Sequence, residues 1–132
     1  MGLFNKLFGS GEDGGSDTKI NWEHIHNMDE LELAIVLSNE RPVALFKHST
    51  RCSISSMAKN RLERAWDFEE GQGPAMYFLD LIAYRKVSNA IAEQLGVRHE
   101  SPQIILLKDE AVIYHSSHSA ISIEALKKAL EA

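Results

Sequence analysis

The sequence predicts one α/β domain in which a central mixed sheet carries helices on both faces and ends in a β-hairpin. Short apolar runs typical of buried strands alternate with segments of helical spacing. Two further apolar runs near the C-terminus are separated only by a tight turn at 108–110. The length of 132 residues allows one hydrophobic core and is too short for two. Right-handed crossovers between parallel strands then place helices on both faces of the sheet.

The first half of the chain predicts two strand–helix units. In the first helix, apolar residues such as Leu31 and Ala34 recur at helical spacing, and the helix ends before Pro42. The run PVALFKH suits a strand that is covered on both faces. Helical spacing then returns, with an expected apolar face of Met57, Leu62, Ala65 and Trp66. The expected elements are a strand at 20–22, a helix at 28–38, a strand at 42–48 and a helix at 53–66.

The second half predicts a strand, a helix, a hairpin and a closing helix. Gly71, Gly73 and Pro74 interrupt the chain before the apolar run AMYFLD. The next helix should stop at Gly96, and Ser122 should cap the last helix. The expected elements are a strand at 75–80, a helix at 87–95, strands at 103–107 and 111–115, and a helix from 122.

Residues 1–18 differ in composition from the rest. A Gly, Ser, Asp and Glu tract there cannot bury enough surface to offset its ordering entropy, although Leu3, Phe4, Leu7 and Phe8 could form a short amphipathic turn. We therefore expect a disordered N-terminal tail at 1–18 and a folded domain at 19–132.

Composition excludes several classes of protein. Hydrophobic residues make up 44% and charged residues 25%, as in ordinary soluble domains. The net charge of -5 and the absence of a Lys and Arg cluster argue against nucleic-acid binding, and no apolar run is long enough to span a membrane. One cysteine cannot form an internal disulfide, and nothing in the N-terminal residues reads as a cleaved secretory signal, so we expect a reducing compartment. We expect a cytoplasmic protein that can act as a monomer.

The single cysteine, Cys52, stands where the strand at 42–48 gives way to a helix. The free N–H groups and the dipole of a helix start stabilise an anion such as a thiolate. Lys47, His48 and Arg51 are candidate cationic neighbours in sequence. We therefore expect Cys52 to be substantially ionised at neutral pH. The alternative is a cysteine buried as a small hydrophobe, but the surrounding KHSTRCSISS is polar.

The order of elements, with a cysteine at a helix start and Ser101-Pro102 before the hairpin, resembles the thioredoxin fold. CSIS stands where thioredoxins carry Cys-x-x-Cys. More narrowly, KHSTRC followed by Ile54-Ser55 resembles the YtxJ-like family, the monothiol bacilliredoxins, whose pattern is close to K-H-S-T-x-C-P-I-S. The resemblance covers the chain from Ile20 onward. Ser53 departs from it, because the family usually has proline there, which is well suited to the first turn of a helix.

The resemblance implies a thiol-disulfide oxidoreductase whose nucleophile is Cys52. Its partners would be S-bacillithiolated client proteins, and bacillithiol would be a co-substrate, with no bound cofactor. Ser55 stands at the resolving position and cannot form a disulfide, so a second low-molecular-weight thiol must reset Cys52. In such proteins the proline before the hairpin is cis and lies against the cysteine. The residues expected to bind the client are Thr50, Ser53, Ile54, Ser101 and Pro102.

The roles of two catalytic candidates stay open at this point. Ser55 either offers its hydroxyl to the thiolate or is an exposed helix residue. His48 either stabilises the thiolate as a cation or orders the loop at the strand end. Arg51 is a further catalytic candidate because of its charge.

Other functions remain open as well. The protein could use another low-molecular-weight thiol, isomerise or sense disulfides, or bind clients without turnover. A hydrolase with Cys52 and a histidine base lacks support from any oxyanion-hole motif. The pairs His24/His26 and His115/His118 lack the further ligands of a zinc site, so we expect no metal.

Overall fold

The computed structural model describes residues 20–69 and 71–131. The tail expected at 1–18 and the boundary of the domain at 19 lie outside these residues. Ten elements follow one another in the order strand, helix, strand, helix, strand, helix, strand, strand, 3-10 helix, helix. They are β1 Glu23–His24, α1 Met28–Leu37, β2 Val43–His48, α2 Ser53–Ala65, β3 Ala75–Asp80, α3 Arg85–Leu95, β4 Gln103–Lys108, β5 Ala111–Ser117, a 3-10 helix at His118–Ala120, and α4 Ile123–Glu131.

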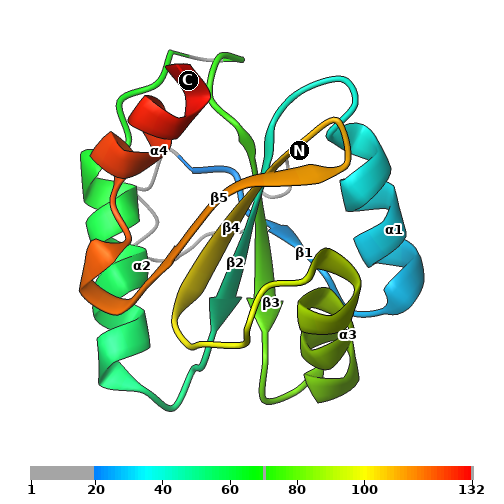
Figure 1. Cartoon of the computed structure of the whole chain (residues 1–132). Coiled ribbons are helices and arrows are strands. Elements are labelled where there is room, and N and C mark those ends of the chain that lie inside the picture. The colour runs from blue at the N-terminus through cyan, green and yellow to red at the C-terminus, as the bar shows by residue number, and fades with distance from the viewer. Residues whose placement is uncertain (1–19, 70, 132) are drawn as a thin grey trace, which may run out of the picture.

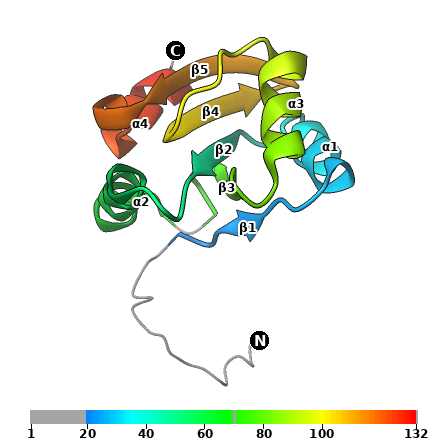
Figure 2. The same cartoon turned by 90° about the horizontal axis from the view of Figure 1, so that it is seen from below.

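The predicted α/β architecture is confirmed (Figures 1 and 2). One five-stranded sheet has the order β1-β3-β2-β4-β5, in which β1 and β2 run parallel to β3 whereas β4 is antiparallel to β2 and to β5. Helices α1 and α3 cover one face, and α2 and α4 cover the other (Figures 1 and 2). The parallel strands therefore deliver their C-terminal ends, including the end of β2 before Cys52, to the same edge of the sheet.

Local signals placed the ends of several elements correctly. The strand 75–80 was predicted at its observed bounds, and α3 ends at Gly96, whose φ of 68° is the left-handed conformation that glycine adopts without strain. Ser122 caps α4 by accepting a hydrogen bond from the Ala125 N–H at 3.1 Å. The first strand was predicted too early, at 20–22. It lies at Glu23–His24 because these residues pair with Tyr77 and Phe78 of β3.

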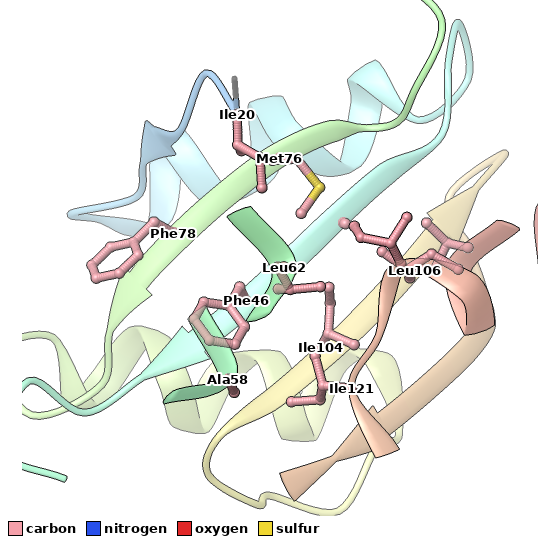
Figure 3. Close-up of a cluster of buried hydrophobic side chains, with 12 residues drawn as sticks. Ile20, Phe46, Ala58, Leu62, Met76, Phe78, Ile104, Leu106 and Ile121 are labelled. Carbon is pink, nitrogen blue, oxygen red and sulfur yellow. The ribbon is translucent and has the colours of Figure 1, made fainter. Parts of the chain in front are cut away.

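The core forms two clusters, one on each face of the sheet. Strand β2 is buried along its whole length, and its side chains alternate between the clusters. Figure 3 shows the cluster on the α2 and α4 face, where Phe46 and Leu62 meet Ile104 and Ile121. The cluster on the α1 and α3 face contains Leu31, Ala34, Val43, Leu45, Leu79, Val87, Ile91, Ile105 and Leu107.

Helix α2 buries only part of the apolar face that its hydrophobicity predicted, because Leu62 is buried and Trp66 packs on the core, but Met57 and Ala65 are exposed. Ser55, Ala58 and Leu62 are buried, whereas Met57, which we expected on the apolar face, is 63% exposed. The i, i+4 pair of Ala58 and Leu62 sets the buried face, and Met57 lies outside it. Ile54, three residues before Met57, is also exposed, so an apolar strip follows Cys52 on the outer surface of α2.

Candidate active site

Cys52 is the N-cap residue of α2, where it links the polar loop after β2 to the helix. Its backbone is extended, with φ -110° and ψ 120°. Its N–H donates to the Ser49 carbonyl at 3.1 Å, and its own carbonyl accepts from the Ser56 N–H at 3.1 Å. The side chain is half-buried and reduced. Cys52 is therefore neither sealed in the core nor loosely attached, because a tight turn on one side and the helix on the other fix its backbone.

The backbone amides of the first turn of α2 lie next to Cys52. The first-turn amides of a helix have no partner four residues back, and the 13-residue helix has no acidic residue in its first turn. The thiol itself makes no capping hydrogen bond to these amides. The sulfur is consequently available for bonding to a substrate, next to backbone groups that stabilise an anion.

Ser55 and His48 form a buried pair beneath the loop that carries Cys52. Ser55 is fully buried, its Oγ lies 2.7 Å from His48 Nδ1, and the same oxygen accepts from the Ser49 N–H at 3.1 Å. Of the two alternatives predicted for Ser55, an exposed helix residue is therefore wrong. Two bonds to the strand end and the loop occupy its hydroxyl, and they hold the turn before Cys52 in place.

The structure supports the second interpretation of His48, as a residue that orders the loop. Burial lowers the pKa of His48, the Lys59 ammonium lowers it further, and the Asp80 carboxylate acts in the opposite direction. A histidine whose pKa is lowered is uncharged at neutral pH. The prediction that His48 could serve Cys52 as a cation is therefore not supported.

Lys47, which we expected as a cationic neighbour of Cys52, lies on the other face of the sheet. Successive residues of a strand point to opposite faces, so Lys47 lies on the α1 and α3 face while Phe46 and His48 face α2. Its side chain is fully buried, and its Nζ lies 3.2 Å from His99 Nδ1. Burial lowers the pKa of Lys47 to about 8.

Most of the other predicted site residues surround Cys52 at the surface. Arg51 is exposed and makes no ion pair with any residue from 20 to 69 or 71 to 131. It can therefore turn toward a bound anion. The surface residues predicted to bind the client are all exposed beside the nucleophile: Thr50, Ser53 and Ile54.

The Ser101–Pro102 peptide bond is cis, as the resemblance implied. Lys47 of β2 pairs with Gln103 of β4, so this dipeptide lies just beyond the paired end of β2, at the edge of the sheet where His48 leads into the Cys52 loop. Pro102 is buried and Ser101 is half-buried. The fold therefore brings the two segments, which are about fifty residues apart in sequence, to one end of the sheet.

The backbone at Ser53 would accept the proline that the family pattern has at this position. It is the first residue of α2, and the preceding Cys52 has the extended backbone that a residue before proline requires. We expect Ser53→Pro to raise the free energy of unfolding by about 0.5 to 1 kcal/mol, because proline restricts the unfolded chain. Urea denaturation measures the change.

The matched control for this prediction is Ser56→Pro. That change removes the hydrogen bond from the Ser56 N–H to the Cys52 carbonyl and should destabilise by about 3 kcal/mol or more. A Ser53→Pro protein that is less stable than the original would show that the Ser53 N–H has a partner that matters.

A cavity that the sequence does not predict begins at Thr50, in the loop before Cys52. It has a volume of about 410 Å³ and brings together residues from β1, β2, α2 and β3. Tertiary packing assembles it from segments that are far apart in the sequence, so no local pattern predicts it. Its lining residues are Trp22, His24, His48, Thr50, Ser56, Lys59, Asn60 and Phe78.

A larger cavity of about 650 Å³ lies at the other end of β3 and is therefore distant from the nucleophile. Arg41, Trp66 and Tyr77 are among its lining residues.

In the described part of the chain, no three His, Cys, Asp or Glu side chains gather as metal ligands. Among the same residues no helix is long and apolar enough to cross a membrane.

Comparison with known proteins agrees with this geometry. A family model described as monothiol bacilliredoxin BrxC matches residues 23–126. One solved structure, of a protein of thioredoxin fold with a proposed oxidoreductase activity, is 26% identical with a TM-score of 0.70, over 83% of this chain and 93% of that one. The thioredoxin NaTrxh from Nicotiana alata is 18% identical with a TM-score of 0.66, over 89% and 97%.

A third similar structure, thioredoxin Mala s 13 from Malassezia sympodialis, is 16% identical with a TM-score of 0.65, over 89% of this chain and 95% of that one. At such identities the two thioredoxins support the fold alone. The family match spans most of the described domain and includes the turn with Cys52. The chain therefore belongs to the monothiol bacilliredoxin family and is a thiol-disulfide oxidoreductase of thioredoxin fold.

Proposed function

We propose that this protein removes bacillithiol from protein mixed disulfides, with Cys52 as the nucleophile. The observation that carries the proposal is the position of a single half-exposed cysteine at the N-cap of α2, with Ser55 in place of a resolving cysteine. Since Ser55 is buried and bonded to His48 and Ser49, it contributes structure and no sulfur chemistry.

The reaction needs two thiol exchanges. In the first, the Cys52 thiolate attacks the bacillithiol sulfur of the client mixed disulfide, which forms a Cys52–bacillithiol disulfide and releases the client cysteine as a thiolate. In the second, the thiolate of another low-molecular-weight thiol attacks that disulfide at the bacillithiol sulfur. The products are a small-molecule disulfide and the Cys52 thiolate, so the client is reduced and the added thiol is oxidised.

The surface around Cys52 suits an extended client segment. Ile54 and Met57 present exposed apolar side chains on the first turns of α2, with exposed fractions of 57% and 63%. Thr50 and Ser53 flank the nucleophile, and Ser101–Pro102 ends at the same edge of the sheet. Exposed apolar residues beside a polar rim are typical of a site for transient protein contacts.

Intact-mass analysis after exposure to oxidised bacillithiol, and separately to oxidised glutathione, tests the proposal. We expect one adduct per chain in each case, formed at least about ten-fold faster with bacillithiol, a difference of about 1.4 kcal/mol in activation free energy. Cys52→Ser is the control and should form no adduct.

Faster reaction with glutathione would assign the protein to another thiol. No adduct with either compound, together with client binding that is independent of added thiol, would favour a binding module without turnover.

A further inference from the structure

We propose that the cavity beside Cys52, lined by Trp22, His24, His48, Lys59 and Phe78, binds the non-sulfur part of the low-molecular-weight thiol, with a carboxylate of that thiol held by Lys59. This inference rests on the proposed function and adds the side chains that would recognise the small thiol. We call this site the Trp22–Lys59 cavity.

The cavity is placed to receive a group attached to the Cys52 sulfur. Two of its lining residues, Thr50 and Ser56, lie on either side of Cys52, in the preceding loop and one helical turn later. The Ser56 N–H bonds directly to the Cys52 carbonyl. A molecule joined to the sulfur through a disulfide therefore has the cavity as an adjoining space, and about 410 Å³ fits a small ligand but not a folded client.

The walls of the cavity are largely aromatic. Phe78 lies at the centre, with its ring centroid 6.0 Å from Trp22, 5.0 Å from His24 and 5.1 Å from His48. Thr50, Ser56 and Asn60 add hydroxyl and amide groups. Aromatic faces beside a few polar groups suit a compact ligand that has both an apolar face and hydrogen-bonding groups.

Lys59 supplies the charge. Its Nζ lies 5.7 Å from the Trp22 ring centroid and 5.9 Å from that of Phe78, so the ammonium lies at the aromatic wall. Glu63 accepts from Lys59 Nζ at 2.7 Å and from Trp22 Nε1 at 2.8 Å, which orients both side chains. One of the three ammonium protons is used in this pair, and the others remain for a ligand.

The charge of the lining favours an anion. None of the described residues that line the cavity is an Asp or Glu, whereas Lys59 is cationic. The Lys59 ammonium lowers the pKa of His48, another lining residue, whereas the Asp80 and Glu63 carboxylates act in the opposite direction. Glu63 offsets part of the Lys59 charge, because its carboxylate lies 2.7 Å from the ammonium, so a ligand carboxylate would bind through the ammonium protons that this pair leaves free, in charge-assisted hydrogen bonds.

Kinetics with three mixed disulfides of one client protein tests the assignment. Two carry thiols with carboxylates, bacillithiol and glutathione, and the third carries cysteamine, which has none. Lys59→Met should lower kcat/KM about ten-fold or more for the first two, mainly through KM, and less than about two-fold for cysteamine. The control is Lys86→Met, an exposed lysine of α3 on the opposite face, which should leave all three rates unchanged.

An equal loss for all three substrates, or no loss for any, would overturn the assignment. A second readout does not depend on turnover. The indole N–H resonance of Trp22 should shift when Cys52 carries bacillithiol and should shift less when it carries cysteamine. Trp66 lines the other cavity, and its ring centroid lies 4.8 Å from that of Phe68. Its indole N–H resonance provides an internal reference and should not shift. Equal Trp22 shifts in the two adducts would also overturn the assignment.

The two proposals fail in different ways. If the original protein forms no adduct with any of the three thiols, the proposed function is wrong and the cavity loses its ligand with it. If adducts form and the client is released, but Lys59→Met does not distinguish thiols with and without a carboxylate, only the cavity assignment is wrong.

Discussion

Replacing Cys52 with serine is expected to abolish release of the client thiol, with a loss of at least roughly a thousand-fold in rate. Cys52 is the only cysteine in the chain, so no other side chain can take over disulfide exchange. A serine hydroxyl is not ionised at neutral pH, and its oxygen cannot form the mixed disulfide. The measurement is the rate at which a bacillithiolated client regains its free thiol in the presence of excess reductant.

The loss should occur without unfolding. The Cys52 thiol is half-buried and makes no capping hydrogen bond, so serine can occupy the N-cap, where it is in fact favoured. The midpoint of thermal unfolding should therefore not fall. A folded Cys52→Ser protein that keeps more than a tenth of the rate would contradict the assignment of the nucleophile.

Replacing Lys47 with methionine is expected to stabilise the protein at pH 7, by up to about 3 kcal/mol. The pKa of Lys47 falls from 10.5 to about 8 because its side chain is buried, and each unit of that difference costs about 1.4 kcal/mol when the amine must be charged. Methionine fills a similar volume without the charge. The substitution removes the contact of 3.2 Å between Lys47 Nζ and His99 Nδ1, but His99 is exposed and can bond to water instead.

The stabilisation by Lys47→Met should depend on pH, because the folded and unfolded chains lose the Lys47 proton at different pH values. Between pH 8 and 10.5 the unfolded chain keeps the Lys47 proton while the folded chain has lost it, so the free energy of unfolding rises with pH in that window. Below pH 8 the cost of the buried charge is fully present. The advantage of Lys47→Met should therefore be constant below about pH 8 and decline toward pH 10.5.

Urea denaturation at a series of pH values, with Lys86→Met as an exposed control, measures this difference. An advantage that does not change with pH, or a variant that is less stable at pH 7, would show that the buried ammonium has compensating partners.

The fold was largely predictable because local patterns determine it. The run AMYFLD, the glycine at 96 and the polar loop before Cys52 each fix an element boundary from neighbouring residues alone. The position of the nucleophile at a helix start follows from the same signals. These features need no knowledge of what packs against them.

The details of the site were less predictable because they depend on tertiary packing. The charge of Lys47 suggested a neighbour for the thiolate, yet strand alternation places it on the other face of the sheet. Met57 is apolar but exposed, because the packing of Ala58 and Leu62 decides the rotation of α2. The Trp22–Lys59 cavity joins four elements, and no local pattern brings Trp22 to Lys59.

The burial of Ser55 bears on how this protein relates to its two-cysteine counterparts. The hydroxyl at this position fastens the end of β2 and the loop to the helix. A cysteine there would replace the hydroxyl with a thiol, which is a weaker hydrogen-bonding group, and would weaken these attachments. The residue that makes the protein depend on an external thiol therefore also anchors the turn before Cys52, so Ser55→Cys would change the redox cycle and the attachment of the loop together.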